Sequence, residues 1–142
     1  MRLLEKAKKS LGQNFLIDNN IINKIVEIGS INKNKTVIEI GAGYGNLTKA
    51  IVSAGPKKIL AIEKDKKLAL LLKNKFKNYD NIKIINRDVL NIIEEDNLEQ
   101  NIIVFGNLPY NVSTKILASL ILLKKMASMV RNLNFNVPKR SC

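Results

Sequence analysis

The 142-residue sequence predicts an α/β fold in which helices flank a doubly wound, mostly parallel sheet. Short β-branched segments alternate with longer segments whose apolar residues recur at helical spacing. Glycines or acidic residues follow several of the expected strands, which is typical of parallel sheets that bind a ligand beyond their carboxyl ends. The length suits one domain, and the sequence contains no internal repeat.

The first expected element is a helix that begins at Asp18 or Asn19, because either side chain can cap a helix N-terminus, and that ends at Gly29. A strand over 36–40 follows. The next helix begins at about Asn46 and stops at Gly55-Pro56. Residues with helical spacing form its apolar face: Leu47, Ala50, Ile51 and Ala54.

The second half repeats this alternation. We expect a strand over 58–62, a helix over about 66–77 and a strand over 82–85. The acidic segment 94–99 leads to a strand over 102–105, and a last apolar helix covers about 113–125. The buried face of the 66–77 helix is predicted to consist of Leu68, Leu71, Leu72 and Phe76.

Composition excludes several kinds of site. The chain has no histidine, which removes Ser-His-Asp, Cys-His and histidine–metal sites, and Cys142 alone cannot form a disulfide framework. A reducing compartment fits best, and neither a signal peptide nor a membrane span is indicated. We therefore expect a cytoplasmic monomer that needs no metal and no membrane.

Positive charge is concentrated at the two flanks. The net charge is +12, with 7 basic and 3 acidic residues in 1–35, 11 and 9 in 36–110, and 6 and none in 111–142. A nearly neutral core between basic flanks suits a polyanion that lies across a nucleotide-sized site. Lysine-rich faces that only increase solubility are the open alternative.

A glycine-rich turn follows the expected first strand, in the stretch Val37–Thr48. Gly41, Gly43 and Gly45 leave the backbone free to approach a ligand, and the next helix presents its unpaired N–H groups there. The spacing Gly-x-Gly-x-Gly is one residue shorter than the dinucleotide fingerprint. An ordinary tight turn remains possible for this motif alone.

Polar residues also follow the other strands. Glu63 follows the second strand and can accept two ribose hydroxyl hydrogen bonds, and Asp88 follows the third and can accept from the amine of an adenine. Each acid alone could instead be a helix N-cap. Asn107-Leu108-Pro109-Tyr110 follows the fourth strand, where two carbonyl acceptors and an aromatic face can hold a planar amino group.

Over about residues 8–125 the chain resembles the small-subunit rRNA adenine N6-dimethyltransferases, a Rossmann-like family that uses S-adenosylmethionine. The segments that carry the resemblance are 9–16 (Lys-Ser-Leu-Gly-Gln-Asn-Phe-Leu), 39–48, Glu63, 87–90 and 107–114. The resemblance implies a class I methyltransferase core that is incomplete here, with the first four strands and their flanking helices. It also implies dimethylation of two adjacent adenosines in a hairpin loop of small-subunit rRNA, within the immature small ribosomal subunit.

The resemblance assigns roles to individual residues. It implies that Gln13, Asn14 and Leu16 close over the methionine end of the cofactor, and that Glu63 holds the ribose. The remaining cofactor contacts that it implies are Glu39, Gly41, Gly43, Gly45, Asp88, Val89 and Asn107. Asn107, Leu108, Pro109 and Tyr110 would form the catalytic motif, with Asn107 and the Pro109 carbonyl engaging the target amine. No metal is required.

We therefore divide the chain into a basic arm and helix (1–35), a partial cofactor-binding core (36–125) and an aberrant basic tail (126–142). Read one base later, the codons for the tail are compatible with a family-like continuation, so we interpret the tail as a frameshift product or a disordered end. The nucleotide sequence of codons 120–142 tests this. We expect a cofactor half-site with poor solubility and little or no turnover, because the strand 102–105 would lose a neighbour.

Three alternatives stay open. A nicotinamide dehydrogenase would share the glycine turn and Glu63, but it has no use for Asp88 or the 107–110 motif. A non-catalytic RNA-binding fragment needs only the basic flanks, and Asn107→Ala would then leave its function intact. A large-subunit rRNA adenine methylase has similar motifs, although Leu108 and the 42–46 segment favour the small-subunit type.

Overall fold

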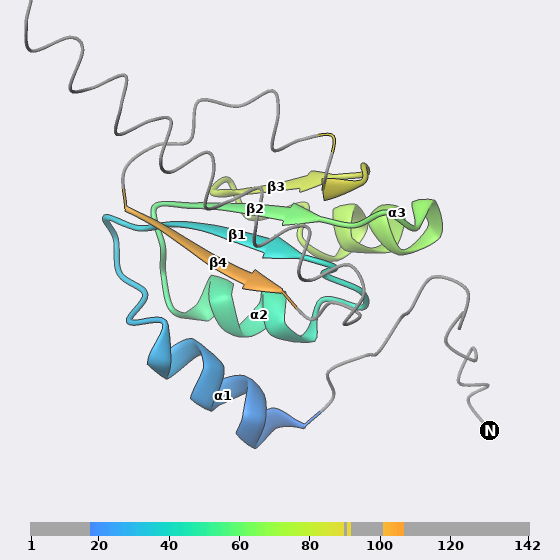
Figure 1. Ribbon diagram of the computed structural model, residues 1–142. Helices are drawn as coiled ribbons and strands as arrows, with labels where there is room; N and C mark the ends of the chain where they lie inside the picture. The colour runs from blue at the N-terminus through green and yellow to red at the C-terminus, as the bar shows by residue number, and fades with distance from the viewer. Residues whose placement is uncertain (1–17, 90, 92–100, 107–142) are drawn as a thin grey trace, which may run out of the picture.

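The computed structural model describes residues 18–89, 91 and 101–106. In this part of the chain, four parallel strands form one sheet in the order β3-β2-β1-β4 (Figure 1). The strands are β1 (Thr36–Ile40), β2 (Lys58–Ile62), β3 (Ile82–Ile85) and β4 (Ile102–Gly106). All four were predicted from their β-branched segments, and β4 is one residue longer than expected.

The strand order places β1 at the point where the chain changes direction across the sheet. From β1 the chain moves outward to β2 and β3, and then returns to the other side of β1 as β4. Register is continuous: Thr36 lies opposite both Lys58 and Ile102, and Ile40 lies opposite both Ile62 and Gly106. In open α/β sheets, ligands bind beyond the carboxyl ends of the strands at such a change of direction.

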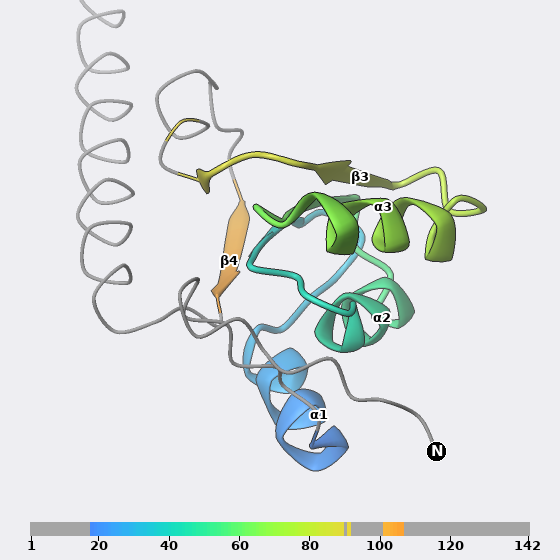
Figure 2. The same cartoon turned by 90° about the vertical axis from the view of Figure 1, so that its right-hand side faces the viewer.

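The helices are α1 (Asn19–Ile28), α2 (Asn46–Ser53) and α3 (Lys66–Lys75), which follow one another along the sheet in Figure 2. Asp18 caps α1, as predicted, by accepting from Asn20 N at 2.8 Å and Ile21 N at 3.3 Å. Gly29 ends α1 with φ −66°, so it is not needed for a left-handed turn. A Cβ at Gly29 would lie 2.5 Å from Phe105 Cζ, which explains the glycine by close packing against β4.

Two apolar clusters join the helices to one face of the sheet. Ile51 of α2 packs with Val37 and Ile59, and Leu72 of α3 packs with Ala61. Because Ile59 and Ala61 are two residues apart in β2, both helices cover the same face. Side chains on the opposite face are buried as well, as expected for parallel strands: Ile38, Ile40 and Ile62.

Helix α3 corrects one prediction. Leu68, Leu72 and Phe76 are buried as expected, but Leu71 is 40% exposed, and Ala69 is buried instead. The five consecutive apolar residues from Leu68 to Leu72 lie on several sides of the helix, so their pattern does not show which side faces the sheet. The helix also ends at Lys75, two residues earlier than expected. Among the described residues, no helix is both long and apolar enough to cross a membrane.

Candidate functional site

The carboxyl ends of the strands meet at one edge of the sheet. Gly41 N donates to Ile62 O at 2.8 Å, and Glu63 N donates to Ile85 O at 2.9 Å, so the turns after β1 and β2 start while still bonded to the neighbouring strand. β4 ends at Gly106, opposite Ile40. The segments that follow β1, β2 and β3, where the candidate residues lie, therefore begin side by side.

The glycine turn between β1 and α2 has three residues in the left-handed region. The φ angles are 75° at Gly41, 59° at Gly43 and 81° at Gly45. Gly45 is also the N-cap of α2, where it lies against α3: a Cβ there would approach Leu72 Cδ2 to 2.7 Å and Phe76 Cε2 to 2.9 Å. Conformation and packing both require glycine at this position.

Glu63 links the glycine turn to the end of β2. Its carboxylate accepts from Gly43 N through Oε2 and from Asp65 N through Oε1, both at 2.8 Å, and the residue is 6% exposed. A carboxylate has about four acceptor positions, so it can still accept from hydroxyl groups of a ligand. The N-cap of α3 is Asp65, which accepts from Lys67 N and Leu68 N, so the alternative role of Glu63 as a helix cap is wrong.

Glu39 lies beneath this site, near the end of β1. It is 2% exposed, and Oε2 accepts a hydrogen bond from Thr48 Oγ1 of α2 at 2.6 Å. Burial raises the pKa of Glu39 from 4.5 to about 7; the charge of Glu63 raises it further, and the bond from Thr48 opposes the rise. Glu39 therefore holds α2 against β1 and is close enough to Glu63 to feel its charge.

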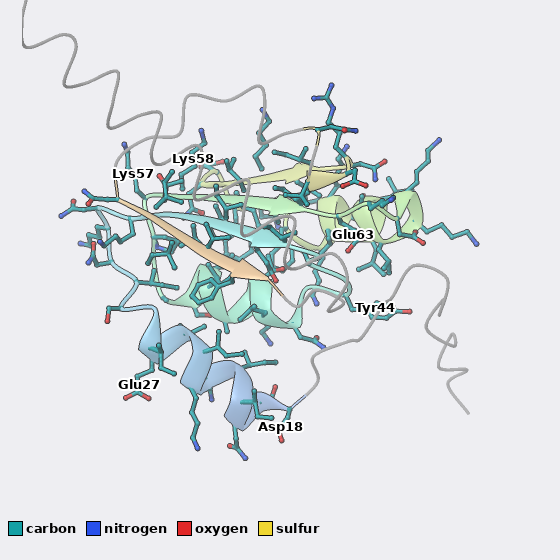
Figure 3. All side chains as sticks on the ribbon, viewed as in Figure 1. Asp18, Glu27, Tyr44, Lys57, Lys58 and Glu63 are labelled. Atoms are coloured by element: carbon teal, nitrogen blue, oxygen red, sulfur yellow. The ribbon has the colours of Figure 1, made fainter. Side chains whose placement is uncertain are left out.

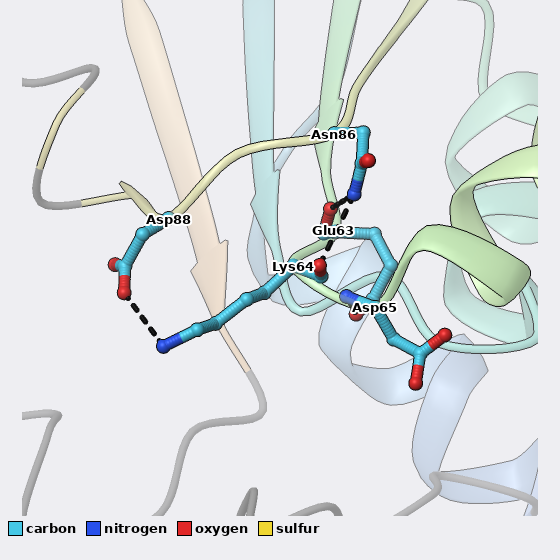
Figure 4. Close-up of polar contacts among 5 residues, drawn as sticks. All are labelled: Glu63, Lys64, Asp65, Asn86 and Asp88. Atoms are coloured by element: carbon cyan, nitrogen blue, oxygen red, sulfur yellow. Dashed lines mark hydrogen bonds and ion pairs between the residues drawn. The ribbon is translucent and has the colours of Figure 1, made fainter.

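Asp88 follows β3 at the same edge, and Figure 4 shows its surroundings. Lys64 Nζ donates to Asp88 Oδ2 at 2.9 Å, from the tip of β2 to the segment after β3. Asn86 Nδ2 donates to Glu63 O at 2.9 Å and Lys64 O at 3.1 Å, which fixes the backbone between them. Val89 is 6% exposed. Gly43, Glu63 and Asp88 thus lie at one edge, as the sequence predicted.

The other predicted site residues lie outside the described residues: Gln13, Asn14, Leu16, Asn107, Leu108, Pro109 and Tyr110. The expected helix 113–125, the acidic segment 94–99 and the tail 126–142 also lie outside them. Within the described ranges, no group of three or more His, Cys, Asp or Glu side chains is arranged to hold a metal ion.

Sequence reasoning missed four residues that support the site. They are Thr48, which bonds Glu39; Lys64, which pairs with Asp88; Asn86, which bridges two carbonyls; and Lys75, which donates to Tyr44 O at 2.9 Å. Lys64 and Asn86 each lie next to or near a predicted acid, which was the only signal available. Lys75 lies 31 positions from Tyr44, and no sequence pattern indicates that contact.

Comparison with known proteins gives a consistent result. The sequence profile of the family described as ribosomal RNA adenine dimethylase matches residues 4–140, a wider range than the 8–125 predicted from the motifs. The frameshift interpretation of 126–142 stays a prediction for the nucleotide sequence to test. "Ribosomal RNA small subunit methyltransferase A" of Pelagibacter ubique is 56% identical over 117 residues, covering 82% of this chain and 44% of the relative.

The protein of the same name from Streptococcus thermophilus is 44% identical over 120 residues, covering 80% of this chain and 41% of that protein. The chain thus spans less than half the length of these curated relatives. Among solved structures, the 23S rRNA methyltransferase ErmE has a TM-score of 0.66 at 26% identity, over 75% of this chain and 42% of that one. A dimethyladenosine transferase from Plasmodium falciparum has 0.65 at 25%, over 76% and 38%.

These structural neighbours have the Rossmann-like methyltransferase fold, and the chain matches part of it. The glycine turn, the acids after β2 and β3 and the match over residues 4–140 agree with one another. The chain belongs to the ribosomal RNA adenine dimethylase family.

Proposed function

We propose that this chain contains the cofactor half of an enzyme that transfers methyl groups from S-adenosylmethionine to N6 of adjacent adenosines in small-subunit rRNA. The observation that carries the proposal is the bond from Gly43 N to Glu63 Oε2. It joins the glycine turn to a buried carboxylate at the carboxyl edge of the sheet, where nucleotide-type ligands bind in such folds.

The described residues fit the cofactor. Glu63 is held by two backbone N–H groups and keeps acceptor capacity for two ribose hydroxyls, while Asp88 can accept from the adenine amine. The glycines of the turn have no side chains, so the methionine end of the cofactor can approach the backbone there. Gln13, Asn14 and Leu16 would close over this end of the cofactor. When bound, S-adenosylmethionine supplies a methyl group that is already electrophilic, so no metal or covalent nucleophile is required.

The 107–110 motif would position the target base. The nitrogen of the adenine amine is a weak nucleophile, because its lone pair is delocalised into the ring. Accepting its N–H bonds at the Asn107 side chain and the Pro109 carbonyl would favour a pyramidal nitrogen that faces the methyl group. Tyr110 would stack on the base, which must leave its helix to reach the site; such stacking contributes about 1–3 kcal/mol.

The relatives support the small-subunit substrate over the large-subunit alternative. Two proteins named for the small subunit are 56% and 44% identical to this chain, whereas the 23S methyltransferase structure is 26% identical. We therefore propose immature small-subunit rRNA as the partner, a cytoplasmic location and a monomeric state. The complete reaction is proposed for a protein of the relatives' full length, of which this chain spans less than half.

Equilibrium binding tests the cofactor proposal. We expect the chain to bind S-adenosylmethionine in calorimetry and not NAD, which a dehydrogenase would prefer. Glu63→Gln should weaken binding at least about tenfold, because hydrogen bonds to a charged group contribute about 1.5–3 kcal/mol. Glu27→Gln, an exposed change on α1, is the control and should bind normally. Binding of NAD, or equal binding by Glu63→Gln, would contradict the proposal.

A further inference from the structure

Lys64 spans the gap that an adenosine group would have to occupy. Its backbone is at the tip of β2, and its ammonium reaches Asp88 Oδ2, after β3, at 2.9 Å (Figure 4). If Glu63 holds a ribose and Asp88 holds the attached base, the nucleoside must cross between the same two strand tips. The lysine stem and its ammonium run between these two strand tips.

The backbone around Lys64 is held by hydrogen bonds, whereas its side chain is mostly exposed. Asn86 holds the carbonyls of Glu63 and Lys64, and the Glu63 carboxylate accepts from Asp65 N, so the backbone on both sides of Lys64 is fixed. The Lys64 side chain is 65% exposed and that of Asp88 is 32% exposed. The ammonium can therefore swing into solvent without disturbing Glu63 or the cap of α3.

We propose that Lys64 is an affinity-determining residue: its ion pair with Asp88 closes the adenosine end of the site, and an adenine amine competes with the ammonium for the Asp88 carboxylate. This inference rests on the proposed function of Asp88. Exposed ion pairs of this kind contribute about 0.2–1 kcal/mol, which corresponds to about a 1.4- to fivefold change in dissociation constant.

The test compares three variants of the full chain in calorimetry with S-adenosylmethionine and with adenosine. Lys64→Met keeps most of the stem but removes the charge, and it should bind both ligands about 1.4- to fivefold more tightly at 20 mM salt. Lys64→Arg keeps the ion pair and should bind like the unaltered chain. Lys66→Met removes an exposed charge two residues further on and should also bind like the unaltered chain.

Salt supplies a second readout. Raising the salt concentration to 300 mM screens exposed charges, so the advantage of Lys64→Met should shrink toward onefold. Adenosine is uncharged, which separates displacement of the ion pair from general repulsion of a cationic ligand. Equal or weaker binding by Lys64→Met, or the same gain in Lys66→Met, would overturn the inference while leaving cofactor binding intact. Failure of the unaltered chain to bind S-adenosylmethionine would overturn the proposed function, and this inference with it.

Discussion

The ionisation of Glu39 depends strongly on the fold. Its pKa is about 7 in the folded protein because the carboxyl is buried, against 4.5 for an exposed glutamate. The folded chain keeps this proton between pH 4.5 and 7, whereas the unfolded chain releases it. The free energy of unfolding should therefore fall as pH rises through this window and level off above it. The chain has no histidine, so few other side chains titrate there.

Replacing Glu39 by glutamine should remove this pH dependence. We expect the unaltered chain to lose about 2 kcal/mol of unfolding free energy between pH 5.5 and 8, at about 1.4 kcal/mol per pKa unit. Glu39→Gln cannot ionise, so its stability should change much less. Urea unfolding at the two pH values measures both, with the exposed Glu27→Gln as control. Parallel curves for Glu39→Gln and the unaltered chain would contradict the assignment.

Gly45 combines a left-handed conformation with close packing, and Gly55 separates the two effects. Gly55 also has a positive φ, of 69°, but a Cβ there meets nothing within 4 Å. Gly55→Ala should cost about 1–2 kcal/mol for conformation alone. Gly45→Ala adds contacts below 3.0 Å with Leu72 and Phe76, so we expect a further 1–3 kcal/mol, roughly, and weaker cofactor binding. Equal losses in thermal unfolding would show that packing at Gly45 is unimportant.

The residues that come within three positions of a strand's end were the predictable part of the edge. Glu63 and Asp88 could be placed at this edge because a parallel sheet gathers its strand ends there. The partners of these acids could not be assigned. Thr48 approaches Glu39, and Lys75 approaches Tyr44, only once α2 and α3 pack on the same face of the sheet. The spacing of residues indicates the faces of a single helix or strand, and it carries no information about contacts between elements.

At the scale of elements, strand bounds were predicted better than helix faces. β1, β2 and β3 have the expected bounds, because short β-branched segments between turn residues leave little choice. In α3, five consecutive apolar residues allowed two neighbouring faces, and Leu71 was placed on the wrong one. The strand order β3-β2-β1-β4 depends on pairings across the chain, which the alternation of elements did not specify.

The cap of α3 should matter for stability, because α3 supports the glycine turn through Leu72 and Phe76. Asp65 accepts from Lys67 N at 2.8 Å and Leu68 N at 3.2 Å. Asp65→Ala leaves both N–H groups without this acceptor and should lower the unfolding free energy by about 0.5–2 kcal/mol. Asp65→Asn retains a capping oxygen and should lose little. Equal stability of the two variants in chemical denaturation would show that loss of the capping oxygen does not lower the unfolding free energy.

Across the whole molecule, acidic side chains gather where the strands end, and two neighbouring lysines lie at the opposite edge of the sheet. Figure 3 shows Glu63 and Tyr44 at the edge where the strands end, and Lys57 and Lys58 at the opposite edge. Glu39, Asp65 and Asp88 also belong to the carboxyl edge. Lys64 at this edge pairs with Asp88, and burial raises the pKa of Glu39 to about 7, so the carboxyl edge does not by itself attract RNA. Residues 111–142 contain six basic residues and no acid, and we expect them to supply that attraction.

RNA binding should therefore depend on salt, and the flank should account for much of that dependence. With about four to six phosphate contacts and the single-strand slope of about −0.7 per contact, affinity for a small-subunit hairpin loop should fall about 50- to 300-fold between 50 and 200 mM salt. Changing Lys124, Lys125 and Arg131 to glutamine should reduce the slope of log affinity against log salt by about two. The matched triple change of Lys33, Lys57 and Lys58 removes the same charge from the opposite edge and should leave the slope unchanged. Fluorescence anisotropy measures all three chains. If both triple variants reduce the slope equally, the positive charge acts uniformly, as a solubilising surface would. Only a contact localised at the flank would make the two variants differ.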